Sequence, residues 1–281
     1  MSSTGLAALA AWLAETPNAG APVEHIRLGG LYHLAMKPWA PLAGASAYLA
    51  VSRWWGRRNV RRAGAAGPGA ARRSARLKPF VILHSLLLMA YSMWTFADYS
   101  SALVQAARAH GLKSTFYDSH GLLWSGKLLE HGFLFYLSKY YEFLDTAIIL
   151  AKGRPASRLQ TFHHAGAVAI MWLGNYTRAP YLTFFVLENS LIHSLMYAYY
   201  VLTAVGIRPP GKQHLTRIQI AQFYVCLGAG AIYVLFPGAL SGPQRLFAYV
   251  FIAYTVELVR LFTDFSRKEY GGAPAAAKKR A

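Results

Sequence analysis

Two adjacent histidines, His163 and His164, stand in the otherwise apolar stretch RLQTFHHAGA at residues 158–167. Burying an imidazole in apolar surroundings costs free energy unless its nitrogens are hydrogen-bonded. A neutral imidazole can attack a thioester without first losing a proton, and the product is an acyl-imidazole. A second imidazole nearby can move protons or stabilise a developing oxyanion or enolate. The pair is therefore compatible with metal ligation, with acyl transfer, or with two polar residues that have merely found partners.

Polar side chains recur every three or four residues in three other apolar segments, which is the spacing of one helical face. Gln160 lies one turn before both histidines and can reach the same patch. The other polar positions are Lys139, Glu142, Asp145 and Thr146, then Asn189, His193, Met196, Tyr197 and Tyr200, and finally Thr216, Gln219 and Gln222. One such stripe could supply interhelical hydrogen bonds worth about 0.6 kcal/mol each. Four stripes on consecutive segments predict a lined polar chamber.

The charges of the segment 132–150 decide how it can sit in a membrane. Each charged residue near a helix centre costs roughly 2.5–3.5 kcal/mol, so Lys139, Glu142 and Asp145 together cost about 9 kcal/mol. The leucine, isoleucine and phenylalanine residues of 133–150 recover roughly 0.3–0.6 kcal/mol each, about 4 kcal/mol in total. The polar face must therefore point into a helix bundle or a water-filled cavity where the charges can pair. An interhelical ion-pair network is the structural alternative to a functional site.

A metal site is not expected. The chain has ten histidines, and a di-iron oxygenase or desaturase needs many of them in several clustered boxes. Only His163, His164 and His193 lie among the polar stripes. The remaining histidines are scattered singly and mostly resemble loop or interface residues: His25, His33, His84, His110, His120, His131 and His214.

The single cysteine, Cys226, excludes an intramolecular disulfide framework and a cysteine-based zinc site. It lies in an apolar run with no neighbouring base, which favours a small packing residue over a thiol nucleophile. A histidine nucleophile fits the stripes better. A transporter or receptor stays open as an alternative, because membrane spans that contain an ion pair suit either.

The composition predicts an all-α integral membrane protein. The chain is 55% hydrophobic and only 14% charged, which is a low charge content for a soluble protein. Seven segments are long and apolar enough to cross a bilayer core: 31–51, 80–106, 132–150, 159–176, 181–204, 218–237 and 246–265. The short connection at 151–158 predicts an antiparallel hairpin of the third and fourth spans. The low-complexity stretch RRNVRRAGAAGPGAARRSAR at 57–76 is expected to be a flexible loop.

Lysine and arginine residues gather on one side of this topology. The loops 53–78, 152–158 and 206–217 and the tail 266–281 carry nine, three, three and five of them, against six on the other side. The positive-inside rule then places the C-terminus in the cytosol and the segment 1–30 in a lumen. The net charge of +18 is thus a topology signal and does not indicate nucleic-acid binding. Cytosolic basic residues could also attract anionic lipids or a phosphate-bearing substrate.

The four motifs KYYEFLDT, QTFHH, NSLIHSLMYAYY and TRIQIAQ, in this order and spacing over residues 139–222, resemble those of the ELO family of very-long-chain fatty acid elongases. The resemblance implies seven helices, six of them forming a barrel around an acyl tunnel, as an elongase domain over 31–265. It implies a condensing enzyme of the endoplasmic reticulum that joins a fatty acyl-CoA to malonyl-CoA and releases CO2, CoA and a 3-ketoacyl-CoA. No cofactor beyond these substrates is implied. The implied partners are the bilayer, the ketoacyl-CoA reductase, dehydratase and enoyl reductase of the cycle, and a second copy of the chain.

The resemblance also implies roles for individual residues. His163 would be the nucleophile that carries the acyl group, His193 would assist the condensation, and His164 would support them by hydrogen bonding. The residues implied to shape the polar chamber are Gln160, Lys139, Glu142, Asp145, Asn189, Tyr197, Tyr200, Gln219 and Gln222. Charge alone suggests that the CoA phosphates meet Lys152, Arg154, Arg208 and Lys212. Lys278 and Lys279, fourth and third from the end, resemble a dilysine signal for the endoplasmic reticulum.

One position departs from the family pattern. The usual box is His-x-x-His-His, and Gln160 takes the place of the first histidine. Glutamine cannot act as a base or nucleophile, but its amide donates and accepts hydrogen bonds, so this position is expected to orient other groups. A catalytically degenerate homologue is the alternative. The same glutamine box occurs in some algal elongases, whose similarity leads us to expect C18 polyunsaturated, Δ9-type acyl-CoA substrates.

Overall fold

The structure, a computed structural model, describes residues 23–63, 69–236, 238 and 240–271. Every regular element within these ranges is an α-helix or a short 3-10 helix. Most of the segment 1–30 lies outside the described residues, and so do Lys278 and Lys279. The described chain begins with three short elements, η1 (Val23–His25), η2 (Gly29–Leu31) and α2 (Tyr32–Ala35).

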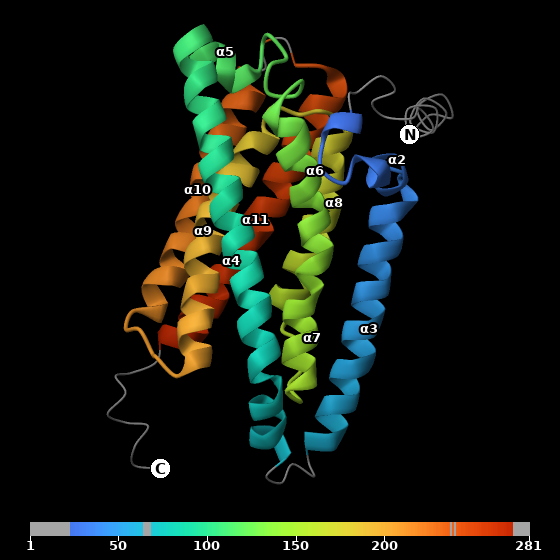
Figure 1. Cartoon of the computed structure of the whole chain (residues 1–281), viewed down its shortest axis with the longest axis vertical. Helices are drawn as coiled ribbons and strands as arrows, with labels where there is room; N and C mark the ends of the chain where they lie inside the picture. The colour runs from blue at the N-terminus through green and yellow to red at the C-terminus, as the bar shows by residue number, and fades with distance from the viewer. Residues whose placement is uncertain (1–22, 64–68, 237, 239, 272–281) are drawn as a thin grey trace.

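Long helices then run along the long axis of the molecule (Figure 1). They are α3 (Trp39–Ala63), α4 (Gly69–His110), α6 (Lys127–Tyr141) continued by α7 (Phe143–Ala151), α8 (Arg158–Tyr176), α9 (Leu182–Val205), α10 (Lys212–Leu235) and α11 (Gly242–Tyr270). The short α5 (Leu112–Tyr117) follows α4. α3, α7, α9 and α11 end at the same end of the bundle, where α4, α8 and α10 begin. We call it the basic end, because the lysine-rich and arginine-rich connections predicted to share a side meet there.

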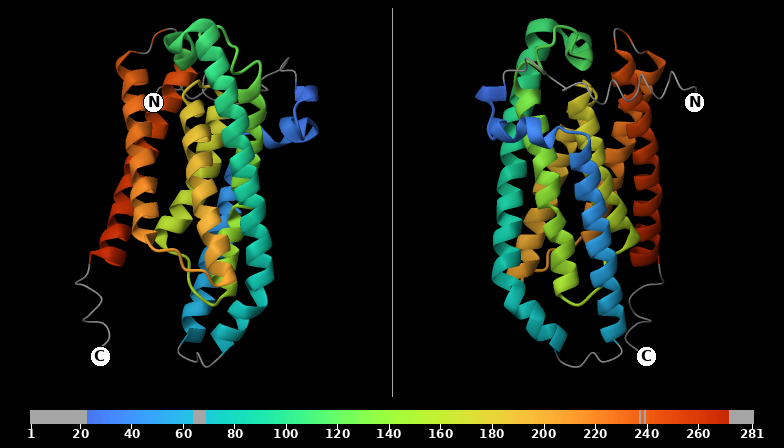
Figure 2. Two further views of the ribbon diagram at one scale, coloured as in Figure 1. Left: turned by 60° about the vertical axis from the view of Figure 1, so that its left-hand side comes forward. Right: turned by 90° about the vertical axis from the view of Figure 1, so that its right-hand side faces the viewer.

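Within the described part of the chain, three helices have the length and apolarity of membrane spans: Ser74–His110 within α4, α10 and α11. The third predicted span is divided into α6 and α7, of 15 and 9 residues, which are each too short to cross a bilayer. α3 carries arginines in its second half. The other four predicted spans and the six-helix barrel stay predictions. Figure 2 shows α10 and α11 packed as a pair at one side of the bundle.

The predicted flexible loop is largely helical. α3 continues to Ala63 and α4 begins at Gly69, so only residues 64–68 separate the two helices. Alanine and arginine dominate this stretch, and both are strong helix formers, which offsets the glycines. Figure 2 shows the first turns of α4 set at an angle to the rest of the helix, and Pro79 lies inside that helix. A proline removes one backbone hydrogen bond and bends a helix at that point.

One further predicted boundary was wrong, and one predicted span is interrupted within its length. The first span was expected from residue 31, but α3 begins at Trp39, directly after Pro38; the residue before a proline is disfavoured in the α conformation. The third span is interrupted at Glu142. Its backbone carbonyl accepts a hydrogen bond from the N–H of Asp145, three residues later (3.0 Å).

The predicted hairpin of the third and fourth spans is confirmed. Near one end of the bundle, Asn175 of α8 donates to the carbonyl of Gly132 in α6 (3.0 Å). Near the basic end, Gln160 of α8 donates to Thr146 Oγ1 in α7 (3.1 Å). Since the start of α8 meets the end of α7 and the end of α8 meets the start of α6, α8 runs antiparallel to α6 and α7.

Aromatic rings fill the bundle at the end opposite the basic end. Tyr181 of α9 packs against Phe251 of α11 with ring centroids 4.8 Å apart, and against Tyr233 of α10 at 5.0 Å. All three side chains are buried. Gly174 of α8 lets a neighbouring helix approach closely, because a Cβ there would lie 2.6 Å from Leu182 Cδ1. This half of the molecule is densely packed, and the open space lies at the basic end.

We expect Gly174→Ala to destabilise the protein, since overpacking a core costs about 1–3 kcal/mol. Gly228→Ala is the matched control: it is also helical, and a Cβ at Gly228 meets nothing within 4 Å. Helix propensity favours alanine equally at both positions. The thermal unfolding midpoint in detergent should fall for Gly174→Ala and stay level or rise for Gly228→Ala. Equal midpoints for the two variants would contradict the close packing at Gly174.

Candidate active site

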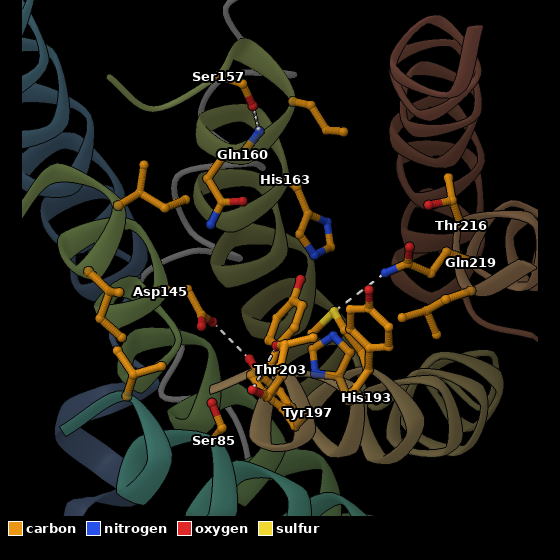
Figure 3. A pocket seen from close by; sticks show the side chains of 18 of the residues that line it. Ser85, Asp145, Ser157, Gln160, His163, His193, Tyr197, Thr203, Thr216 and Gln219 are labelled. Atoms are coloured by element: carbon orange, nitrogen blue, oxygen red, sulfur yellow. Dashed lines mark hydrogen bonds between the residues drawn. The ribbon is translucent and has the colours of Figure 1, made fainter. Parts of the chain in front are cut away.

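A cavity of about 1000 Å³ opens at the basic end between α4, α7, α8, α9, α10 and α11 (Figure 3). It brings together most of the predicted site residues from four separate stretches of sequence. Those that line it are Gln160, His163 and His164 of α8, Asn189, His193, Tyr197 and Tyr200 of α9, Gln219 and Gln222 of α10, and Asp145 of α7. All four polar stripes therefore contribute to one chamber, although Asp145 is the only member of the first stripe that lines it.

Tyr254 of α11 fixes His163. The Tyr254 hydroxyl donates to the backbone carbonyl of His163 (2.9 Å) and lies 3.4 Å from its Nδ1. A hydroxyl that donates to the carbonyl can still accept from a ring N–H, so this geometry favours the hydrogen on Nδ1 and leaves the Nε2 lone pair free. Figure 3 shows the imidazole directed into the cavity. No local pattern around Tyr254 indicated this role.

The imidazole of His164 is 6% exposed, and its centroid lies 5.2 Å from that of His163 at an interplanar angle of 70°. Its Nδ1 has no hydrogen-bond partner among the residues that the structure describes. His164 lines the cavity beside His163.

Gln160 is tied to α7 and α3. Its amide donates to Thr146 Oγ1 (3.1 Å), and the same hydroxyl is 2.8 Å from the Tyr48 hydroxyl. The N-cap Ser157 of α8 accepts from the backbone N–H of Gln160 (3.1 Å). These contacts suit the orienting role expected from the sequence.

We expect Gln160→His to keep activity within about tenfold of the wild type, because a histidine can donate to Thr146 and one hydrogen bond is worth about 1 kcal/mol. Gln160→Leu, which has no donor, should lose more. The activity of both variants is measured as the initial rate of product formation. An inactive Gln160→His variant beside an active Gln160→Leu variant would contradict the orienting role.

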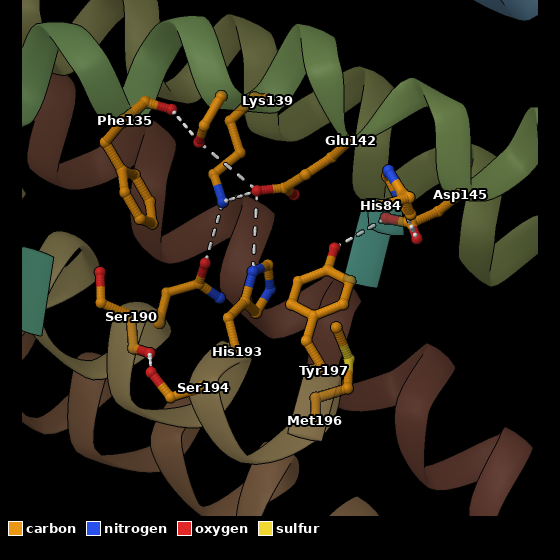
Figure 4. A network of polar contacts seen from close by, with 12 residues as sticks. His84, Phe135, Lys139, Glu142, Asp145, Ser190, His193, Ser194, Met196 and Tyr197 are labelled. Carbon is orange, nitrogen blue, oxygen red and sulfur yellow. Dashed lines mark hydrogen bonds and ion pairs between the residues drawn. The ribbon is translucent and has the colours of Figure 1, made fainter. Parts of the chain in front are cut away.

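Lys139 and Glu142 lie behind His193 and do not line the cavity (Figure 4). Lys139 Nζ donates to Glu142 Oε1 (2.7 Å) and to Asn189 Oδ1 (3.0 Å). His193 Nδ1 lies 3.6 Å from the same Glu142 oxygen. Lys139 and Glu142 are 1% and 2% exposed.

The ion pair of Lys139 and Glu142 lies within one helical segment, because the two residues are three positions apart in the sequence. The interhelical contacts of this segment are instead made by its two carboxylates, Glu142 to His193 of α9 and Asp145 to His84 of α4. The contact from Lys139 to another helix goes to the neutral amide of Asn189. The pair neutralises two buried charges and places a carboxylate oxygen beside His193 Nδ1.

His84 of α4 is a site residue that sequence reasoning missed. Its Nε2 lies 3.0 Å from Asp145 Oδ1, and the Tyr197 hydroxyl donates to Asp145 Oδ2 (2.8 Å). The histidine also lines the cavity. A signal was present, since the polar residues His84, Ser92 and Thr95 of this apolar helix recur at spacings of eight and three, close to whole helical turns.

α10 supplies the wall facing these groups. Gln219 Nε2 lies 3.4 Å from Met196 Sδ, and Gln222 Oε1 is buried with no partner among the described residues. Thr216 is 3.3 Å from the Tyr270 hydroxyl. No group of three or more His, Cys, Asp or Glu side chains is suitably placed for a metal ion within the described ranges.

Basic side chains form part of the cavity lining. Three of the four residues suggested for CoA binding, Lys152, Arg154 and Lys212, line the cavity, and so does Lys78, which the sequence reasoning did not assign. Arg208 is exposed and is not part of the lining. Lys212 pairs with Glu269 (3.0 Å). Burial, followed by the neighbouring charge of Arg154, lowers the pKa of the Lys152 ammonium.

Comparisons with known proteins agree with these motifs. A family model described as ELO: GNS1/SUR4 family matches residues 33–279. Fatty acid elongase sre1 of Dictyostelium discoideum is 34% identical over 152 residues, which cover 52% of this chain and 55% of that protein. Fatty acid elongase 5 of Trypanosoma cruzi is 30% identical over 179 residues, covering 60% and 67%. Very long chain fatty acid elongase 5 of Tachysurus fulvidraco is 26% identical over 215 residues, covering 74% and 71%. Because the family model spans most of the sequence, the chain belongs to the ELO family of fatty acid elongases.

Proposed function

We propose that this chain condenses a C18 polyunsaturated, Δ9-type acyl-CoA with malonyl-CoA to give a 3-ketoacyl-CoA, CO2 and CoA, through an acyl-imidazole on His163. The observation that carries the proposal is the convergence of His163 and His193, from different helices, on one cavity that basic side chains also line. Two imidazoles in a shared chamber can serve the two steps separately, one in acyl transfer and the other in carbon–carbon bond formation.

In the first half of the reaction, His163 Nε2 attacks the thioester carbonyl. The carbon–sulfur bond breaks, CoA leaves with the electron pair, and the imidazole carries the acyl group. The Tyr254 hydroxyl, 3.4 Å from Nδ1, holds the tautomer that leaves Nε2 nucleophilic. His164 supports the ring from the adjacent position.

In the second half, malonyl-CoA loses CO2 and the electron pair of the broken bond passes to the enolate. The enolate carbon attacks the acyl carbonyl, and His163 leaves as a neutral imidazole. His193, whose Nδ1 faces Glu142 at 3.6 Å, presents its other ring nitrogen for assistance to the enolate. A bundle interior that excludes water would protect the acyl-imidazole from hydrolysis.

The basic part of the cavity lining fits the phosphates of CoA, which Lys78, Lys152, Arg154 and Lys212 would meet as charge-assisted donors. We further propose a multi-pass protein of the endoplasmic reticulum membrane with seven spans, six of them around an acyl tunnel, and a cytosolic C-terminus. The product would pass to a ketoacyl-CoA reductase, a dehydratase and an enoyl reductase. A homodimer is part of the proposal. The two substrates need no further cofactor.

The test uses microsomes that contain this chain, labelled malonyl-CoA, and saturated, monounsaturated and polyunsaturated acyl-CoAs of C16 to C20. We expect label in the 3-ketoacyl product, with the highest rate for a C18 polyunsaturated acyl-CoA. A preference for a saturated chain would overturn the substrate proposal alone. No label from any acyl-CoA with folded protein would favour a catalytically degenerate homologue, which Gln160 in the histidine box makes the leading alternative, or a seven-span lipid transporter.

A further inference from the structure

His84 connects α4 to the site through a short chain of contacts (Figure 4). Its Nε2 is 3.0 Å from Asp145 Oδ1, and Asp145 Oδ2 accepts from the Tyr197 hydroxyl at 2.8 Å. The Tyr197 ring packs edge-on against the His193 ring, with centroids 5.4 Å apart and an interplanar angle of 87°. Three helices, α4, α7 and α9, thus meet around one aspartate.

His193 needs this chain because Glu142 alone does not fix its orientation. The distance of 3.6 Å from His193 Nδ1 to Glu142 Oε1 exceeds that of a normal hydrogen bond. A contact of this length leaves rotation about the side-chain bonds of His193 only weakly restricted. The edge of Tyr197 supplies the missing restriction by packing, and a hydroxyl bonded to Asp145 keeps that edge in place.

His84 is itself held rigidly. It stacks on Phe80, with centroids 6.1 Å apart at 15°, and faces Tyr141 at 5.3 Å and 32°. Its side chain is 1% exposed. An imidazole packed between two rings can aim its Nε2–H at one carboxylate oxygen and at little else. A carboxylate oxygen only accepts, so Nε2 carries the hydrogen of this contact.

A second pair in the same bundle shows which part of this arrangement is particular to the site. His131 of α6 lies 2.7 Å from Asp98 of α4 and is 0% exposed. Both histidines leave Nδ1 without a partner among the described residues. Each pair thus joins a buried histidine to a carboxylate of another helix, although Asp98 is also paired with Lys127 (2.7 Å). His84 and Asp145 line the cavity, whereas His131 and Asp98 do not.

We propose that His84 is a positioning residue for the condensation half of the reaction: it holds Asp145, Asp145 holds the Tyr197 ring, and that ring fixes the imidazole of His193. The proposal rests on the function proposed above, in which His163 carries the acyl group and His193 serves the condensation. His84 should therefore affect one half of the reaction and leave the other intact.

Two conservative variants separate the possible roles of the two ring nitrogens. In His84→Gln the amide nitrogen falls near the position of Nε2 and can still donate to Asp145. In His84→Asn it falls near Nδ1 and cannot reach Asp145. A displacement of about 1 Å in a reacting group costs on the order of 10²-fold in rate. We expect His84→Asn to lower kcat for condensation by about that factor with an unchanged KM for malonyl-CoA, and His84→Gln to keep most of kcat.

Acyl transfer is measured separately, as CoA released from acyl-CoA in the absence of malonyl-CoA. Both variants should release CoA like the wild type. His131→Asn is the matched control, which should lower the thermal unfolding midpoint while leaving both half-reactions unchanged. Loss of acyl transfer and condensation in parallel in His84→Asn, or an unchanged kcat, would overturn the proposal. Equal losses in the asparagine and glutamine variants would overturn it as well.

A measurement that needs no catalysis tests the role of His84 independently of the proposed function. With ¹⁵N-histidine-labelled protein in lipid nanodiscs, the ring signals of His193, assigned through a His193→Gln variant, should stay sharp in His84→Gln and become broadened or split in His84→Asn. Unchanged His193 signals in His84→Asn would sink the positioning role. If wild-type protein releases no CoA from acyl-CoA alone, the acyl-imidazole mechanism fails, and the ring signals still decide the role of His84.

Discussion

His163→Ala is expected to reduce condensation at least about 10⁴-fold, the scale of loss when a catalytic nucleophile is removed. The fold should survive, because the contact that Tyr254 makes to the His163 carbonyl at 2.9 Å uses the backbone and persists in the variant. Alanine is also a better helix former than histidine. The measurement is labelled 3-ketoacyl product per folded protein, with the thermal unfolding midpoint recorded in parallel.

A direct readout of the intermediate strengthens this test. Wild-type protein incubated with acyl-CoA alone should gain the mass of one acyl group on the peptide that contains His163, and His163→Ala should not. The matched control is His33→Ala, an exposed histidine outside the cavity, which should keep both activity and adduct. Turnover like that of the wild type in His163→Ala, or an acyl adduct on another residue of that variant, would show that the nucleophile lies elsewhere.

The polar chamber could be predicted because its residues repeat at helical spacing within single segments. Asn189, His193 and Tyr197 share a face of α9 and line one cavity with Gln160 and His163 of α8. Periodicity reports such faces directly, since residues three and four apart are neighbours on a helix. Which faces meet follows from the need to pair charges away from lipid.

Contacts that join single residues of distant segments could not be predicted in this way. His84 and Asp145 are 61 positions apart, and Tyr254 and His163 are 91 apart, so no local spacing links them. The break at Glu142 could not be predicted either, because the spacing of Ser138, Lys139 and Glu142 is the same in a continuous helix and in one interrupted at this point. Lys139 and Glu142 were expected at the chamber surface, yet they lie behind His193, since an ion pair that is mutually satisfied can be buried.

The ion pair itself offers the second large effect, and one that separates stability from catalysis. Lys139→Met or Glu142→Leu alone leaves one uncompensated charge in the bundle, and we expect a loss of about 3–5 kcal/mol in unfolding free energy. The double variant removes both charges and should regain most of that stability, because apolar replacement of a buried pair is often neutral.

In the double variant, His193 nevertheless loses the carboxylate that faces its Nδ1 at 3.6 Å. Condensation in the double variant should therefore stay about 10²-fold or more below the wild type, the contribution of a positioned acid–base group. Unfolding midpoints and condensation rates of the three variants test both halves, with Arg27→Met, which breaks the exposed pair of Arg27 and Glu130 (2.7 Å), as the control. If the double variant recovers both stability and turnover, Lys139 and Glu142 serve the fold alone.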